Sequence, residues 1–321
     1  MKHRTMPLLL LAMCLLLASS AAVSLHKALA SAPSATLHAA SASPENVDMV
    51  EATLYYRFAS TPMLAAETRT LTVRRDETAE LSVVRALLEG PSAGNSDLSR
   101  IFPESVQAES VSWRDHTLYI TFNEALLSAF ELPSNWATQP EWEAEAPLRR
   151  KLAIQSVVAS LTESFPYTGV QILVHRPSQA LTSLRLDNAF FLTDLSGLSD
   201  PFVRDESLLL TPQNTAYAII SAWQSRDYDT LYQYVAATDA GEPKPIFSDA
   251  VQQMDAAPSL FNFSVSGGSV SPDGQRCVVV ARLEILNEDA VLPSIHYPLA
   301  LVRENDVWKI TVSTLAALLN R

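Results

Sequence analysis

The chain has 321 residues, of which 48% are hydrophobic and 18% charged, and its formal net charge at pH 7 is −12. This length allows two ordinary domains, and this composition is typical of globular proteins with a substantial core. The first thirty residues hold three basic and no acidic side chains, so the remainder carries −15. We therefore do not expect nucleic acid as a partner, because an acidic surface repels phosphate backbones.

The N-terminus has the pattern of an export signal. Lys-His-Arg at residues 2–4 precedes an apolar run over residues 7–25, and Ala-Leu-Ala at residues 28–30 is the small-x-small pattern before a cleavage point. We expect residues 1–30 to be a signal peptide cleaved after Ala30, or else an uncleaved membrane anchor. Either alternative predicts an extracytoplasmic protein, secreted or anchored.

The two cysteines add a further constraint. Residues 11–14 resemble a bacterial lipobox that ends in Cys14, but Met13 stands where a small residue is expected, so we do not expect a lipoprotein. Without residues 1–30 the single cysteine is Cys277, which cannot form an internal disulfide. Valines follow Cys277 and predict a buried thiol. Residues 31–48, rich in Ala, Ser and Pro, are expected to be a flexible spacer.

We expect residues 49–210 to form a first domain that opens with a strand. Apolar and polar residues alternate over residues 52–58, and a short second strand is expected at residues 70–73. A helix follows, because residues 76–78 supply an N-cap and Gly90 a C-terminal stop. Two further strands are expected at residues 108–113 and 117–122, followed by a short helix from Asn123 and an interruption over residues 133–147.

The stretch from Leu152 to Val174 combines a helix, a turn and a strand. Apolar residues recur at helical spacing between Ile154 and Phe165, so one face of this helix is expected to be apolar. Residues 165–169 break the helix, because Pro166 has no amide hydrogen to donate. Alternation over residues 170–174 predicts a half-buried strand. The order of elements predicts an α+β domain with a largely antiparallel sheet.

Short motifs follow one another in this domain in a fixed order. They are Leu54-Tyr55-Tyr56, Leu87-Leu88-Glu89-Gly90-Pro91-Ser92, Ile101-Phe102-Pro103-Glu104, Ser110-Val111-Ser112, Leu118-Tyr119-Ile120-Thr121-Phe122, Ser156 to Phe165, Val170 to Val174 and Asp200 to Leu208. Taken together, this ordered set resembles the GerMN domain of bacterial spore germination and sporulation proteins, over about residues 50–208.

The resemblance to the GerMN domain implies an extracytoplasmic module of endospore-forming and related Gram-positive bacteria. It implies a fold similar to the ring-building modules of secretion complexes, and a role in assembling protein complexes rather than in catalysis. Residues 133–147 form a longer insertion than the family pattern has.

The insertion and the residues after it hold our candidate partner contacts. Trp136 and Trp142 either form an exposed partner site, since Trp is enriched at binding hot spots, or cover the domain's own core. Arg149 and Arg150, with Lys151, form the clearest basic cluster, at an expected helix start where the dipole does not favour cations. The cluster either contacts an acidic partner or is an ordinary solvated helix face.

Residues 211–321 are expected to form a second domain, in which helices precede strands. Thr211 and Asp227 are N-cap candidates for two helices, and residues 246–254 are a third helical piece. Alternation of Phe261, Phe263 and Val265 begins the strand region. Turn signals then separate further strands at residues 276–286, 294–303 and 307–311, and a last helix is expected at residues 313–319.

This order of helices followed by a four-stranded antiparallel sheet resembles the nuclear transport factor two-like (SnoaL-like) fold. The resemblance implies a cone-shaped sheet with a pocket beneath its helices, in a family where some members catalyse and many only bind. A catalytic hypothesis would place His296 or Asp229 in that pocket as a general acid or base. By alternation, His296 is instead expected on a solvated sheet face.

We expect no enzymatic activity, no cofactor and no metal site. The sequence contains no C-x-x-C, no P-loop, no G-x-S-x-G, and no histidine pair at metal-ligand spacing. The leading hypothesis is a non-enzymatic scaffold protein of the bacterial cell envelope, in sporulation or germination, whose partners are envelope proteins. The membrane is expected as a partner only through an uncleaved N-terminal segment. A homo-oligomer is a further alternative. The alternatives are a small-ligand-binding module and, less favoured, a hydrolase, both using the C-terminal pocket.

Overall fold

The computed structural model describes residues 38–39, 49–128, 130, 132, 135–179, 183–287 and 290–320. The expected signal or anchor (residues 1–30) and nearly all of the expected spacer lie outside the described residues. Within the described ranges, no helix combines the length and the apolar character needed to cross a membrane. The strand β1 (His38–Ala39) precedes the first long strand.

One sheet of the N-terminal portion is centred on β2 (Met49–Phe58). It pairs antiparallel with β3 (Leu64–Thr72) along its length, and with β4 (Leu98–Ser99) only at Arg57 and Phe58. Every second side chain of β2 from residue 52 to 58 is buried, which confirms the alternation in the sequence. The expected strand at residues 70–73 was too short, because β3 begins at Leu64, where Ala-rich sequence gives little alternation.

A second sheet contains β5 (Ala108–Arg114), β6 (Thr117–Phe122), β7 (Gly169–His175) and β8 (Ser183–Arg185), neighbours in that order. The pair β6–β7 is parallel, so the expected antiparallel arrangement fails there. The prediction of a half-buried β7 was also wrong. Gln171 points away from Val170 and Ile172 but is also buried. Its side-chain amide donates to the carbonyl and hydroxyl oxygens of Ser199, which supply hydrogen-bond partners for this buried polar group.

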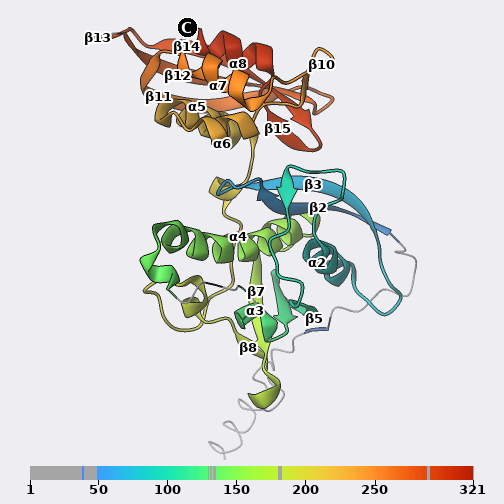
Figure 1. Ribbon diagram of the computed structural model, residues 1–321. Helices are drawn as coiled ribbons and strands as arrows, with labels where there is room; N and C mark the ends of the chain where they lie inside the picture. The colour runs from blue at the N-terminus through green and yellow to red at the C-terminus, as the bar shows by residue number, and fades with distance from the viewer. Residues whose placement is uncertain are drawn as a thin grey trace, which may run out of the picture. The chain divides into compact units, whose positions relative to one another are not determined.

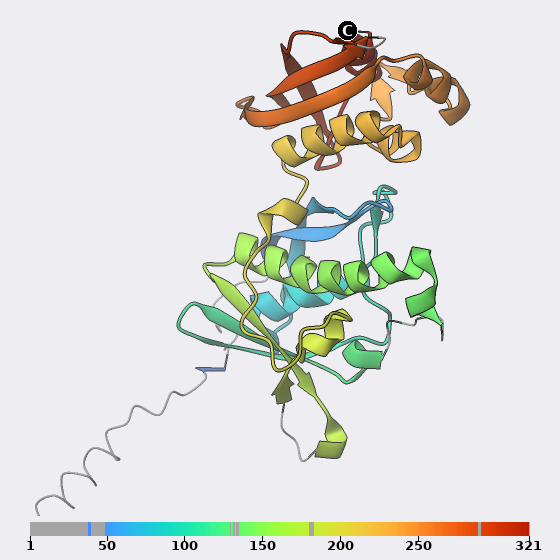
Figure 2. The same ribbon diagram turned by 90° about the vertical axis from the view of Figure 1, so that its left-hand side faces the viewer.

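Helices α2 (Ala79–Glu89) and α4 (Pro140–Ser164) lie between these two sheets (Figures 1 and 2). The N-cap of α2 is as predicted, since Thr78 Oγ1 accepts a hydrogen bond from the Leu81 amide at 3.2 Å. Gly90 ends α2 with φ of 102°, which favours glycine. The short helix expected after Asn123 is α3 (Ala125–Ser128), and the 3₁₀ segments are η1 (Trp136–Thr138), η2 (Pro177–Gln179), η3 (Asn188–Phe191) and η4 (Glu206–Leu208).

Two expectations for α4 were wrong. The interruption expected over residues 133–147 ends at Pro140, where proline suits the first helical position, and the helix continues through Pro147. Glu and Ala, good helix formers, surround Pro147 and offset part of its cost. The helix was expected to have one apolar face, but residues 152–161 are all buried because a sheet lies on each side.

The C-terminal portion places helices before a curled sheet, as the sequence predicts. Helix α5 (Pro212–Ser225) is capped by Thr211 and packs along β11 and β12. The other helices are α6 (Tyr228–Gln233), α7 (Phe247–Asp255) and α8 (Val312–Leu319), and a small ribbon pairs β9 (Thr238–Asp239) with β10 (Glu242–Pro243). The fold as a whole is α+β.

The curled sheet is antiparallel in the order β11-β12-β14-β15, with β13 beside β12. Its strands are β11 (Ser259–Val270), β12 (Arg276–Asn287), β13 (Ala290–Val291), β14 (Ile295–Glu304) and β15 (Val307–Lys309). Phe261, which alternates in the sequence with Phe263 and Val265, is 58% exposed, whereas the other two are half-buried. A bulge between Leu260 and Asn262 shifts the register and turns Phe261 outward.

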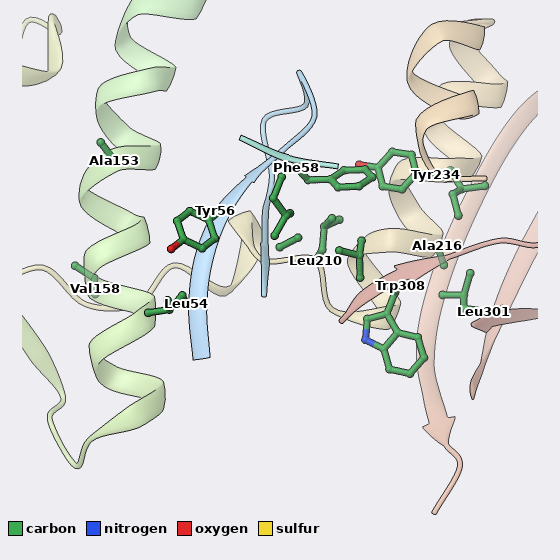
Figure 3. Close-up of a cluster of buried hydrophobic side chains, with 14 of the residues drawn as sticks. Leu54, Tyr56, Phe58, Ala153, Val158, Leu210, Ala216, Tyr234, Leu301 and Trp308 are labelled. Atoms are coloured by element: carbon green, nitrogen blue, oxygen red, sulfur yellow. The ribbon is translucent and has the colours of Figure 1, made fainter. Parts of the chain in front are cut away.

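The described residues from 39 to 320 form one compact unit, with one large cluster of buried apolar side chains and a second, small one of Leu64, Leu152, Ala159 and Leu209. Figure 3 follows the large cluster from Ala153 of α4 through β2 to Trp308 of β15. The rings of Phe58 and Tyr234 lie 5.1 Å apart within it. Lys309, 2% exposed, is paired with both Asp97 and Glu304, so its buried charge has two carboxylate partners.

We predict that Gly268→Ala destabilises the protein and that Gly267→Ala does not. A Cβ at residue 268 would lie 2.6 Å from the carbonyl oxygen of Val278, whereas at residue 267 it would meet nothing within 4 Å. Urea unfolding should show a loss of about 1–3 kcal/mol for Gly268→Ala. Equal stability of the two variants would contradict the close approach of β11 to β12.

Candidate functional site

Three serine hydroxyls fix α4 against the edge of β2. Ser156 Oγ donates to the carbonyl of Tyr55 at 2.5 Å, and Ser160 Oγ accepts from the amide of Tyr55 at 3.0 Å. Ser164 Oγ accepts from the amide of Thr53 at 3.2 Å. Strand β4 reaches only the last two residues of β2, so these hydroxyls supply partners that a neighbouring strand would otherwise supply. The sequence analysis missed this serine row, although its i, i+4, i+8 spacing places it on one side of a helix.

The opposite side of α4 holds the segment that follows residue 199. Gln155 donates to the carbonyl of Val203 at 3.1 Å and accepts from the amide of Asp205 at 3.0 Å. Lys151 pairs with the Asp205 carboxylate at 3.0 Å. Hydrogen bonding from Ser207, followed by Lys151, holds the pKa of Asp205 below its usual value. These contacts give α4 defined partners on two sides.

Of the expected partner contacts, Trp142 and Arg149 lie together. The guanidinium carbon of Arg149 is 5.0 Å from the centre of the half-buried Trp142 ring, and Arg149 Nε is 2.6 Å from Glu145. Arg57 of β2 pairs with the same carboxylate at 2.5 Å. Burial works to raise the pKa of Glu145, but its hydrogen bonds to the two arginines outweigh that effect and lower the pKa.

Arg150 has different surroundings. Its guanidinium lies over the rings of Phe130 and Phe190, 5.8 and 5.1 Å from their centres, and its Nη1 donates to the carbonyl of Phe190 at 2.8 Å. The Nε atom is buried and has no hydrogen-bond partner. In the described part of the chain no carboxylate forms an ion pair with Arg150. Burial lowers the pKa of its guanidinium.

The expected basic cluster at a helix start is therefore not what the structure contains. Arg149, Arg150 and Lys151 lie well inside α4, and each faces different partners. Trp136 is half-buried in η1, ahead of the helix. The prediction was wrong because it placed an interruption over residues 133–147 and hence the helix start after Pro147, whereas α4 begins at Pro140.

Arg149 and Arg150 share one feature, an open pocket of about 640 Å³ beside the first half of α4, which we call the α4 pocket. It is lined by Ile101, Pro103, Glu104, Ser105, Phe130, Leu132, Ala146, Arg149 and Arg150. The two rings around Arg150 come from residues 20 and 40 positions away along the chain. No local sequence pattern could have placed them there, and the sequence analysis missed both.

The C-terminal portion has a smaller pocket of about 270 Å³ between α6, α7 and α8. Its walls include Tyr232, Met254 and Leu315, and neither Asp229 nor His296 lines it. His296 is exposed on the outer face of the curled sheet, across from Arg282, as predicted. In the ranges that the structure describes, no group of three or more His, Cys, Asp or Glu side chains could hold a metal ion.

In the comparison with known proteins, one family model is similar to part of the chain. Residues 53–175 match the model of the Germane family, which is described as sporulation and spore germination. The match covers less than half of the chain and runs from β2 to the end of β7, so it contains α2, α4 and the serine contacts. No curated protein matches this chain.

Solved structures give weaker likenesses. The tandem GerMN domains of the sporulation protein GerM from Bacillus subtilis align at 17% identity and a TM-score of 0.33, over 53% of this chain and 50% of that one. A Clostridium perfringens protein named as a lipoprotein aligns at 18% identity and 0.26, over 52% and 95%. A Campylobacter jejuni protein named as an NTF2-like transpeptidase aligns at 11% identity and 0.23, over 32% and 98%. At these TM-scores the likenesses carry no argument about fold or function, and the chain spans about half of the GerM structure.

We predict that Glu145→Gln destabilises the protein in a pH-dependent way. The folded-state pKa of Glu145 is lowered, so its contribution is present above the unfolded pKa of about 4.3 and is lost as pH falls through the lower folded-state value. Urea unfolding at pH 7 should show a loss of about 0.5–1 kcal/mol, after allowance for solvent screening. The loss should shrink towards zero as pH falls below 4.

The matched control for Glu145→Gln is Glu143→Gln. Glu143 is exposed on the same turn region of α4 and no described cation forms an ion pair with it. A loss that is equal for both variants, or that does not change with pH, would contradict the role assigned to the Arg57–Glu145–Arg149 contacts.

Proposed function

We propose that this protein is a non-enzymatic, extracytoplasmic interaction protein of the bacterial cell envelope that acts in sporulation or spore germination. The observation that carries the proposal is the family match over residues 53–175. That stretch contains α4, which serine hydrogen bonds join to β2 and which bonds on another side, through Gln155, to the carbonyl of Val203. A segment of that kind is a rigid base on which a contact surface can be presented.

An exposed apolar segment beside α4 supports the interaction role. Leu195, Leu198 and Val203 are 67%, 51% and 65% exposed, and we call residues 195–203 the apolar segment. It borders a groove of about 360 Å³ that is lined mainly by apolar side chains, among them Phe191. Large apolar side chains gathered at the surface are typical of protein contact sites. The groove also has Lys151 in its lining, so one cation stands at the edge of this surface.

The proposed location rests on the N-terminal sequence. A basic start, an apolar run and an Ala-Leu-Ala site fit an export signal, and the family description fits a protein of sporulating bacteria. Envelope proteins are the proposed partners, and the membrane is a partner only if residues 1–30 stay attached.

A ligand-binding role for the C-terminal portion is the second candidate. The pocket between α6, α7 and α8 is lined largely by apolar side chains, with the amides of Gln253 and Asn320 as polar groups. Its size, about 270 Å³, suits a small, mostly apolar molecule. The proposed interaction role does not use this pocket, so the two roles can be tested separately.

We predict that an amine-reactive crosslinker links Lys151 to envelope proteins in the native organism during sporulation. The chain has five lysines: Lys2, Lys27, Lys151, Lys244 and Lys309. The side chain of Lys151 is 50% exposed beside the apolar segment, whereas that of Lys309 is buried. Mass spectrometry of the crosslinked peptides should find links to other proteins at Lys151 more often than at Lys244.

Replacement of Leu195 and Val203 by Glu should remove most of the Lys151 links and reduce spore formation or germination. The control is Val278→Glu, which changes a valine on the curled sheet that is 45% exposed and should leave both the links and spore formation or germination unchanged. Normal sporulation and germination after loss of the gene, or Lys151 links that persist in the double variant, would contradict the proposal.

A further inference from the structure

We propose that the α4 pocket is a binding site for a ligand that carries one carboxylate on an apolar group, and that Arg150 is the partner of that carboxylate. The site is distinct from the apolar segment, and the inference does not depend on the proposed function. It rests on the charges of the pocket lining, on the surroundings of Arg150 and on the chemistry of the walls.

Among the described residues, the charged side chains of the lining include one cation that has no carboxylate partner. Arg149 is paired with Glu145, and Glu104 is paired with Arg100 at 3.3 Å. Arg150 also lines the pocket, and none of the described acids forms an ion pair with it. Counted over the described residues, the site therefore carries one positive charge without a carboxylate partner. An unpaired charge that is partly removed from water is costly, and an anion in the pocket would offset that cost.

The guanidinium of Arg150 is already oriented. The rings of Phe130 and Phe190 hold it by cation–π contact, and one N–H is bonded to the carbonyl of Phe190. Phe130 and Phe190 also contact each other, with their centres 5.8 Å apart. The Nε atom is buried and has no hydrogen-bond partner, and apart from Nε–H and the Nη1–H that bonds to Phe190 the guanidinium has further N–H donors. A planar, oriented guanidinium matches a carboxylate, which accepts two parallel hydrogen bonds.

The pocket wall is mixed, and its apolar part can contact an apolar group beside the carboxylate. That part consists of Ile101, Pro103, Phe130, Leu132 and Ala146, and the pocket volume of about 640 Å³ is in the range of small-molecule and side-chain sites. A phosphate dianion fits less well, because one unpaired cation does not balance two charges and Glu104 stands in the lining. Nucleic acid is disfavoured for the same reason, on a chain of net charge −12.

A carboxylate on an apolar group could come from a free organic acid or from the C-terminus of a peptide. Both present the same carboxylate to Arg150. They differ in whether the residue that carries the carboxylate is joined to a peptide chain through its amino group. The probes are therefore 3-phenylpropanoate for the free acid, N-acetyl-Leu-Phe for the peptide, and 3-phenylpropanamide as a neutral compound of the same shape.

The experiment titrates each probe into the full chain and follows the Nε–H signal of Arg150 by nuclear magnetic resonance. This signal is assigned by its absence from Arg150→Met. We expect a saturable shift with at least one carboxylate probe and binding of the amide at least about tenfold weaker, since a hydrogen bond to a charged group accounts for that difference. Tighter binding of N-acetyl-Leu-Phe than of 3-phenylpropanoate would assign the peptide as source, and the reverse would assign the free acid.

Variants make the test decisive. Arg150→Met and Arg150→Lys should each weaken carboxylate binding about tenfold or more, as measured by calorimetry. Arg150→Lys keeps the test possible if Arg150→Met does not fold. Arg282→Met, which changes an exposed arginine of the curled sheet that is paired with Glu284 and does not line the pocket, should change affinity less than about threefold. The proposal is overturned if the amide binds as well as the carboxylates, if no probe saturates below about 10 mM, or if Arg150 variants bind normally.

A Glu131→Gln variant adds one more test to the binding experiment. It follows Phe130 and lies outside the described residues, so its carboxylate is tested rather than placed. We expect Glu131→Gln to leave probe affinity unchanged. An affinity that rises tenfold in Glu131→Gln would mean that the chain's own carboxylate neutralises Arg150, which would overturn the proposal.

Discussion

The hydrogen bonds between the serine row of α4 and the open edge of β2 are the constraint on which the N-terminal portion depends. A buried strand edge must satisfy its amides and carbonyls, and here Ser156 and Ser160 serve both groups of Tyr55. Ser160 also donates to the carbonyl of Ser156 at 2.7 Å, so its hydroxyl is used twice. Because residues 152–161 are buried on all sides, a shift of the helix along β2 would leave these polar groups without partners in the core.

A helix that is fixed in register on one side can present side chains accurately on the others. The same α4 holds the segment after residue 199 through Gln155, joins β2 again through Arg57 and Glu145, and places Arg150 between two phenylalanines. The family match to sporulation and spore germination covers this helix and its supporting strands. The proposed interaction surface and the proposed carboxylate site thus share one rigid support, although they use different sides of it.

The sequence predicted the positions of helices and strands better than it predicted which residues pack around them. Caps at Thr78 and Thr211 and the alternation in β2 are local signals, so they located helices and strands correctly. Local signals failed where residues far along the chain determine burial. Helix α4 was expected to have one apolar face, but it is enclosed by two sheets. Of the candidate contacts, Trp142 and Arg149 do meet, while the rings around Arg150 come from residues too far along the chain for any pattern to join.

Hydrogen exchange at the Tyr55 amide tests the role of the serine row most directly. In Ser160→Ala this amide loses its acceptor, so its exchange should speed up at least tenfold relative to the amides bonded between β2 and β3, and the protein should lose about 1–3 kcal/mol of stability. Thr162→Ala, which removes a hydroxyl bonded only within α4, should leave Tyr55 protected. Unchanged protection of Tyr55 in Ser160→Ala would contradict the account that α4 is held in place by the edge of β2.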